Sequence, residues 1–402
     1  MNGNVVLTNE FLLVAACCRW PPSERRNAAI RSSASQPIDW ANFVRVVERQ
    51  RVAGLVHDGL QSSGVEPPPT VKAHLAAEAG EVARQCLKLA SEALLLQAAF
   101  DRASIAATFV KGTALDLLAY NKIGIKYAWD IDLLIMPRDV RRASDVLAAA
   151  GYKRIKPPTN FAEDRFDAWI GFAYDSLFLN ERNNAYLELH WRLFSNPSLM
   201  SGVTAASSSR QVAVASGRSL RTLGDDDLFS YLCMHGAQHA WSRLKWLADL
   251  AAWLSTKEAG EIERLYRKSR ENGVGRAAAQ ALLLCAQLFA LPMPQDFLAE
   301  LKADRATRWL VAIALDAMAG ASTPEQTDDR LLGNLKIEIS HFLLATGTRA
   351  WLRELNSKLI GGIDFQRIAL PRPLFFIYAV LRIPSWIWRR AVRLGQSRQS
   401  AD

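Results

Sequence analysis

Two carboxylates interrupt the apolar run WDIDLLI at residues 129–135, and this run constrains the fold more than any other stretch. It is short, rich in Ile and Leu and followed by Pro137, which predicts a buried β-strand. Because side chains alternate along a strand, Asp130 and Asp132 point to one face and their apolar neighbours to the other. Two like charges on a mostly buried strand are costly unless a cation neutralises them. Carboxylate oxygens suit Mg²⁺, so the sequence predicts a metal site here.

A turn and a helix precede the acidic strand. Residues 108–110 predict a short strand that enters a turn at Gly112, and residues 113–121 predict a helix. The backbone N–H groups and positive dipole end at such a helix start favour a phosphate. Lys111 and Lys126 add positive charge nearby. A Lys-Gly pair before a helix is by itself an ordinary turn, and the Asp-Ile-Asp strand downstream is what favours a binding site.

These segments resemble a known class of enzymes. The turn at Gly112 and Thr113, the helix and the Asp-Ile-Asp strand are similar to the signature of the DNA polymerase β-like nucleotidyltransferases. More closely, the chain resembles a family of uncharacterised bacterial nucleotidyltransferases within that superfamily. The matching segments, which span about residues 38 to 255, are Lys111–Gly112, Asp130–Asp132, Glu188–Trp191, His235–His239, Trp241–Trp246 and Asp249.

The resemblance implies transfer of a nucleoside monophosphate from a nucleoside triphosphate to an acceptor, with two Mg²⁺ ions held by Asp130, Asp132 and Glu188. Glu188 lies in the predicted strand YLELHWRL, where it shares a face with Tyr186 and His190. Taken alone, a Glu there is more often a solvent-facing residue of an edge strand. Three carboxylates and two Mg²⁺ leave about +1, which cannot balance a triphosphate of about −4, so basic residues are also needed. The nucleotide-binding candidates are Lys111, Gly112, Thr113, Lys126, His239, Arg243 and Lys245.

A later helix carries two histidines. It is predicted to begin at Asp225–Asp227, because negative charge stabilises a helix start. His235 and His239 are four residues apart and so share one face. This spacing is that of an HExxH zinc protease, but Gly236 replaces the Glu and no third ligand follows, which argues against that class. For His239 and the basic residues after it, nucleotide contact and helix packing with solvated basic ends are equally open.

Helices are also predicted before the acidic strand. Residues 38–61 have helical spacing, with Asp39 as N-cap, and a long helix begins at Thr70 after a Pro-rich break. This part is expected to brace the catalytic region. His57 and His74 lie in it and are expected to be surface or packing residues rather than ligands.

The remaining elements follow the same patterns. Residues 137–150 predict a helix and residues 152–155 a strand; residues 168–179 and 185–193 predict two adjacent strands. Residues 201–219 predict a loop with one more strand. From residue 258 to 370 the pattern is helical throughout.

The predicted fold class is α+β, with a small mixed-sheet nucleotidyltransferase core flanked by N-terminal and C-terminal helical regions. Four parts are expected along the chain. They are an N-terminal helical region (1–105), the catalytic core (106–224), a C-terminal helical region (225–370) and a basic apolar tail (371–402).

Charge and cysteine content bound the compartment and the partners. Of the net charge of +9, residues 342–402 contribute +7, from ten Lys and Arg against three acids. A long basic groove for nucleic acid across the whole protein is therefore not supported. Five cysteines without paired spacing predict reduced thiols, no disulfides and a cytoplasmic protein. The N-terminus lacks a basic n-region, so no signal peptide is expected.

The tail contains the apolar segment 374–388, LFFIYAVLRIPSWIW, which Arg382 and Pro384 interrupt. It is too short to span a bilayer, which needs about 20 apolar residues. Trp386 and Trp388 lie beside several arginines, a combination that suits an anionic membrane surface such as the inner face of the membrane. Packing of the tail on the helical arm is the alternative.

Two function classes stand beside the transferase. One is a catalytically inactive fold-alike that binds nucleotides, and the other is a membrane-peripheral interaction protein that acts through its tail. The sequence does not identify the acceptor, which is a protein, a peptide, a small molecule or an RNA end.

Overall fold

A mixed β-sheet forms the centre of the molecule. The computed structural model describes residues 6–158, 161, 163–320, 335–359 and 377. Within them seven strands pair in the order β3-β4-β5-β2-β1-β7-β6. The strands are β1 (Thr108–Phe109), β2 (Asp130–Leu134), β3 (Tyr152–Lys156), β4 (Asp175–Asn180), β5 (Ala185–His190), β6 (Ser209–Ala215) and β7 (Arg218–Leu223). The acidic strand β2 is central, parallel to β5 and antiparallel to β1. The predicted α+β class is confirmed.

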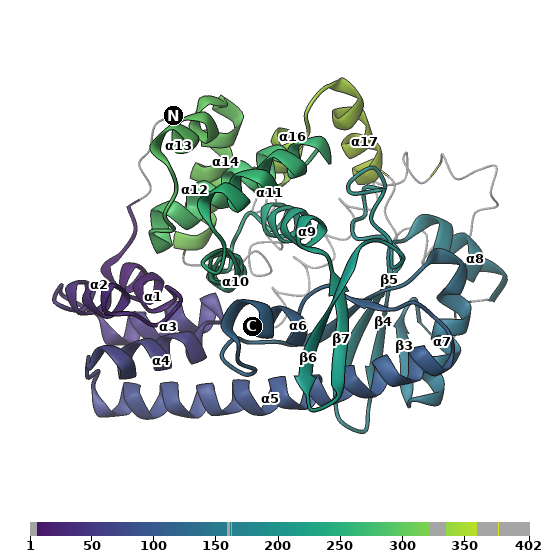
Figure 1. The fold of residues 1–402 in the computed structure, drawn as a ribbon, viewed down its shortest axis with the longest axis horizontal. Coiled ribbons are helices and arrows are strands. Elements are labelled where there is room, and N and C mark those ends of the chain that lie inside the picture. Colours follow the sequence, from purple (N-terminus) through teal and green to yellow (C-terminus); the bar gives the residue numbers. More distant parts are fainter. Residues whose placement is uncertain (1–5, 159–160, 162, 321–334, 360–376, 378–402) are drawn as a thin grey trace, which may run out of the picture.

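The N-terminal helices lie at one end of the sheet and along one of its faces (Figure 1). They are α1 (Asn9–Cys17), α2 (Glu24–Ala34), α3 (Trp40–Gln50), α4 (Ala53–Ser63) and α5 (Pro69–Arg102). Asp39 caps α3 as predicted, because its carboxylate accepts hydrogen bonds from the N–H groups of Ala41 and Asn42. Helix α5 has 34 residues, so it is about 51 Å long, and it packs on α4, α7, β2 and β7.

The C-terminal helices lie on the side of the molecule opposite α5 (Figure 1). They are α9 (Asp225–Gln238), α10 (Leu244–Leu254), α11 (Ala259–Glu271), α12 (Gly275–Phe289), α13 (Gln295–Ala303), α14 (Arg305–Ala319), α16 (Leu335–Leu344) and α17 (Thr348–Leu359). The acidic residues 225–227 form the first turn of α9, after Gly224 at the N-cap. Shorter helices join the strands: α6 (Thr113–Tyr120), the 3₁₀ turn η1 (Pro137–Asp139), α7 (Val140–Ala149) and α8 (Glu163–Phe172).

Two buried cores follow from this layering. Ile131 and Leu133 of β2 and Leu187 and Leu189 of β5 point into a core formed with α5, α7 and α8. The other face of the same strands points towards a second core, built mainly from the N-terminal helices and α9–α14. The carboxylates of β2 therefore lie between the sheet and the C-terminal helices.

The structure corrects two predicted elements and extends a third. The strand predicted at 168–179 is wrong over its first residues, because α8 continues to Phe172 and β4 begins at Asp175. Phe166, Trp169 and Ala173 recur at helical spacing and are all buried, which explains the helix. Residues 201–219 contain the predicted strand, β6, and also the first two residues of β7, which forms a hairpin with β6 through Gly217 at a φ of 69°. Residues 38–61 form two helices, because Arg51 adopts a left-handed conformation that ends α3.

The tail lies outside the described residues except for residue 377, so its membrane or packing role stays a prediction. In the part of the chain that the structure describes, no helix combines the length and apolarity needed to cross a bilayer. The five cysteines are buried as free thiols.

A buried ion network joins α6 to α10. Lys126 Nζ lies 2.8 Å from Asp249 Oδ2 and 3.2 Å from Asp116 Oδ1, and Tyr120 Oη donates to Asp249 Oδ1 at 2.9 Å. All four side chains are almost inaccessible to solvent. Burial raises the pKa of Asp116 to about 7, although Lys126 opposes the shift. The ammonium of Lys126 is thus the cation that makes two buried carboxylates tolerable.

We predict that Lys126→Met lowers the free energy of unfolding by about 3 kcal/mol, because it leaves Asp116 and Asp249 buried without a cation. Urea denaturation followed by circular dichroism measures the change. Lys122→Met is the matched control, since the Lys122 side chain is 53% exposed and its ion pair with Asp58 is long, at 3.6 Å. Equal midpoints for the two variants would show that the network does not support the fold.

Candidate functional site

The three predicted acids arise from two neighbouring strands. In the parallel pair β2–β5, Asp132 is opposite Glu188 and Asp130 is opposite Tyr186. Because residues directly opposite each other in a sheet share a face, Asp130, Asp132 and Glu188 all point away from the core beneath α5. Asp132 is buried, with 2% of its side chain exposed, whereas 32% of the Glu188 side chain is exposed.

Two cations approach these acids. Lys111 Nζ lies 3.0 Å from Asp132 Oδ1. His190 Nε2 lies 3.5 Å from the same oxygen and 3.2 Å from Glu188 Oε2. Ligand atoms of Asp132, Glu188 and His190 fall within 4.8 Å of one another, a spacing that can hold a metal ion. The other carboxylate oxygen of Asp132, Oδ2, is buried and accepts no hydrogen bond.

These neighbours shift the pKa values of the cluster. Burial works against ionisation of Asp132, but Lys111 and His190 hold the pKa of its carboxyl well below the usual range. Burial and the charge of Asp132 raise the pKa of Asp130 to about 6. Burial opposes a charged imidazole, yet the Asp132 and Glu188 carboxylates raise the pKa of His190 to about 10. At neutral pH the cluster therefore contains ionised Asp132 and protonated His190.

A cavity of about 280 Å³ lies over the acids. Strands β2 and β5 provide one wall through Asp130, Asp132, Glu188 and His190, and helices α9 and α10 provide another. The residues contributed by α9, by its C-cap and by α10 are Tyr231, His235, Gln238, His239, Lys245 and Trp246. A smaller pocket shares Lys111, Asp130 and Asp132 with this cavity and extends to Gly112 and Lys126.

The turn before α6 requires a glycine. Gly112 is the N-cap of α6 and has φ 71° and ψ −136°, a conformation that side chains other than glycine rarely adopt. A Cβ placed on Gly112 would meet no atom within 4 Å, so the space beside the turn is open. Thr113 begins the helix and is buried. The turn thus places the start of α6 beside the same pocket as Lys111.

The predicted basic residues take different positions. Lys245 lines both cavities and donates to the carbonyl of Tyr127 at 3.3 Å; burial, together with nearby Lys126 and Lys111, lowers its pKa to about 7. Lys126 lines the smaller pocket, but its ammonium is engaged by the buried acids.

Of the two predicted residues near the end of α9, one lines a cavity and the other does not. His239 lines the larger cavity but is the C-cap of α9 rather than a residue of the helix. Arg243 is buried at the N-cap of α10 and donates to the carbonyl of Arg49 at 3.3 Å. It is absent from the described lining of both cavities.

Several residues of the site were not among the predicted ones. His190 follows Glu188 by two positions, so strand alternation places it on the same face and could have identified it. His235 precedes His239 by one helical turn and shares its cavity. Burial, reinforced by the charge of Lys111, lowers the pKa of His235 well below its usual value. Arg51 and Tyr174 also line the cavity and carry no local sequence signal.

The chain was compared with known proteins. The sequence model of one family, described as uncharacterised nucleotidyltransferase, matches residues 36–290, which include every residue of the site. No curated protein matches the chain, and no solved structure matches it. The family match covers more than half of the 402 residues. The chain therefore belongs to the uncharacterised nucleotidyltransferase family.

Proposed function

We propose that the chain, as a member of the DNA polymerase β-like superfamily, transfers a nucleoside monophosphate from a nucleoside triphosphate to an acceptor with the help of two Mg²⁺ ions. One observation carries the proposal. Asp130, Asp132 and Glu188 lie on one face of paired strands beside a cavity, with Lys111 3.0 Å from Asp132. In metal-dependent phosphoryl and nucleotidyl transfer, clustered carboxylates hold the metal ions and a neighbouring lysine stabilises the negative charge of the phosphates.

The donor atoms fit Mg²⁺. Carboxylate oxygens are its preferred protein ligands, and Asp132 has one oxygen next to Lys111 while the buried Oδ2 accepts no hydrogen bond. Without a metal, three carboxylates face two nearby cations, Lys111 and His190, so negative charge remains in excess. We assign Asp130, Asp132 and Glu188 as the residues that hold the ions. When bound, Mg²⁺ would supply charge neutralisation and Lewis-acid activation of the α-phosphate.

The other residues of the site bind and orient the substrate. Lys111 and Lys245 offer ammonium groups to the triphosphate, and the backbone N–H groups at the start of α6 add hydrogen-bond donors. One of the two aspartates accepts the proton that the acceptor loses. The acceptor oxygen then forms a bond to the α-phosphorus, the bond to the β-phosphate oxygen breaks, and pyrophosphate leaves. Lys126 and Arg243 are proposed to position this machinery through their buried contacts.

The first functional prediction is Mg²⁺-dependent transfer of label from an α-³²P-labelled nucleoside triphosphate. The full chain is incubated with each of the four ribonucleotides and with protein, peptide, small-molecule and RNA fractions as acceptors. We expect label in one fraction together with pyrophosphate release, both abolished by a chelator and restored by Mg²⁺. Saturable nucleotide binding without label transfer or pyrophosphate release in any fraction would instead identify an inactive nucleotide-binding protein.

The second concerns Asp132→Asn. We expect transfer activity to fall at least about 100-fold, because loss of a metal ligand costs more than loss of a residue that merely supports one. We expect the free energy of unfolding to fall, since the substitution leaves Lys111 and the buried His190 without the carboxylate that pairs with both. Asp145→Asn, at an exposed position on α7, is the matched control. Full activity of Asp132→Asn in a folded protein would refute the assignment.

A further inference from the structure

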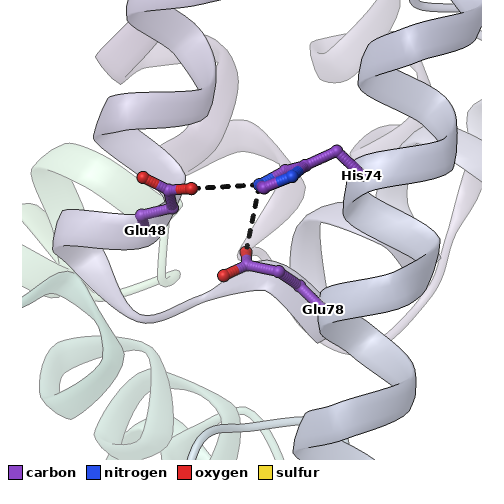
Figure 2. Close-up of side chains that lie close together, drawn as sticks. All are labelled: Glu48, His74 and Glu78. Atoms are coloured by element: carbon purple, nitrogen blue, oxygen red, sulfur yellow. Dashed lines mark hydrogen bonds and ion pairs between the residues drawn. The ribbon is translucent and has the colours of Figure 1, made fainter.

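Three side chains converge between α3 and α5, outside the two cavities that contain the catalytic acids (Figure 2). Glu48 comes from α3, whereas His74 and Glu78 come from α5, where a separation of four residues places them on one face. His74 Nε2 lies 3.0 Å from Glu48 Oε1 and 3.9 Å from Glu78 Oε2. We propose that Glu48, His74 and Glu78 bind a Zn²⁺ ion at a site separate from the catalytic carboxylates.

The spacing of the ligand atoms supports a tetrahedral ion. Zn²⁺ binds His nitrogen and carboxylate oxygen at about 2.0–2.2 Å, which places neighbouring ligand atoms of a tetrahedron about 3.4 Å apart. The two measured separations from His74 Nε2, 3.0 and 3.9 Å, lie on either side of that value. The third separation, between the two carboxylates, is within 4.8 Å. The two His74 separations are thus within about 0.5 Å of the tetrahedral value, and the two carboxylates need to approach each other by at most about 1.4 Å.

The charges at the cluster are not balanced. In the described part of the chain, the ion pairs of Glu48 and Glu78 are both with His74, which supplies at most one positive charge. The Oε2 atom of Glu78 is buried and accepts no hydrogen bond. Nearby acids differ in this respect, because Glu81 pairs with Arg84 and Glu66 with Lys72. A divalent cation would neutralise the excess and satisfy the buried oxygen.

The ligand types select the metal. One imidazole and two carboxylates suit Zn²⁺, whereas Mg²⁺ takes oxygen ligands. Three protein ligands leave the fourth position to water or to a bound molecule. His74 and Glu78 line a cavity of about 580 Å³, from which such a ligand can approach. Trp129 also lines this cavity and stacks on Tyr186 at 4.1 Å, so the cavity extends to the residue next to Asp130.

The site would also fix α3 to α5. Arg51 is the C-cap of α3, three residues after Glu48, and it lines the cavity over the acids. An ion bound by Glu48 of α3 and by His74 and Glu78 of α5 would therefore fix the position of Arg51 in the wall of that cavity. This consequence does not depend on which reaction the cavity performs.

The test is Zn²⁺ titration of the metal-stripped full chain by calorimetry, in an Asp132→Asn background that removes the other metal-binding cluster. We expect one saturable site, which His74→Gln and Glu78→Gln each weaken at least about tenfold. The matched controls are His57→Gln on α4 and Glu81→Gln, whose carboxylate already pairs with Arg84. We expect both controls to bind Zn²⁺ with unchanged affinity.

Two further measurements keep the result clear. Co²⁺, used as a spectroscopic substitute for Zn²⁺, should give visible absorption bands that His74→Gln removes, and Zn²⁺ should raise the melting temperature of the parent chain but not of His74→Gln. If His74→Gln does not fold by circular dichroism, Glu48→Gln at the exposed side of α3 replaces it. Absence of a saturable site, or equal affinity in His74→Gln and His57→Gln, would overturn the proposal whether or not nucleotidyl transfer is observed.

Discussion

Burial of one ionised carboxylate, that of Asp132, determines how the centre of this molecule must be built. An uncompensated charge in such a place would cost several kcal/mol, so a cation must be held against it. Lys111 reaches Asp132 from the turn before α6, and His190 reaches it from the neighbouring strand. The His190 contact depends on the β2–β5 register, which also brings Glu188 opposite Asp132, whereas Lys111 is placed by the turn that follows β1, the other neighbour of β2. The sheet register, the glycine turn and the helices over the acids are thus one connected arrangement.

The buried ion clusters around Lys126 and around Asp132 differ in their access to solvent. At Lys126 the charges are enclosed, and Asp249 receives hydrogen bonds from both Lys126 and Tyr120. At Asp132 one carboxylate oxygen accepts no hydrogen bond, and Glu188 is partly exposed to a cavity. Asp116 Oδ1 in the Lys126 cluster also accepts no hydrogen bond, but the four side chains of that cluster are almost inaccessible to solvent, whereas Glu188 in the Asp132 cluster faces space for a substrate. Both are buried ion clusters with more acids than bases, and accessibility to solvent tells them apart.

Local patterns in the sequence were sufficient for the acidic strand and for the strand that carries Glu188, because alternation assigns each side chain to a face. They were insufficient where one pattern serves two structures. The apolar residues between Phe166 and Ala173 suit a helix or a strand, and only packing on the sheet selects α8. Lys126 could not be separated from Lys111 by pattern either, because its partner Asp249 lies 123 residues away. The family match covers residues 36–290 as a whole. The geometry of the site depends on contacts between distant residues, which no short motif encodes.

One buried amide connects parts of the chain that are made at very different times. The side chain of Gln50 accepts a hydrogen bond from Leu244 N and donates one to the carbonyl of Met318, 268 residues later. A ribosome that adds 5–20 residues per second needs about 13 to 54 s to travel from Gln50 to Met318. Throughout that interval the Gln50 amide, at the end of α3, lacks the hydrogen bond to the carbonyl of Met318. The nascent chain therefore completes the bonding of this buried amide only late in its synthesis.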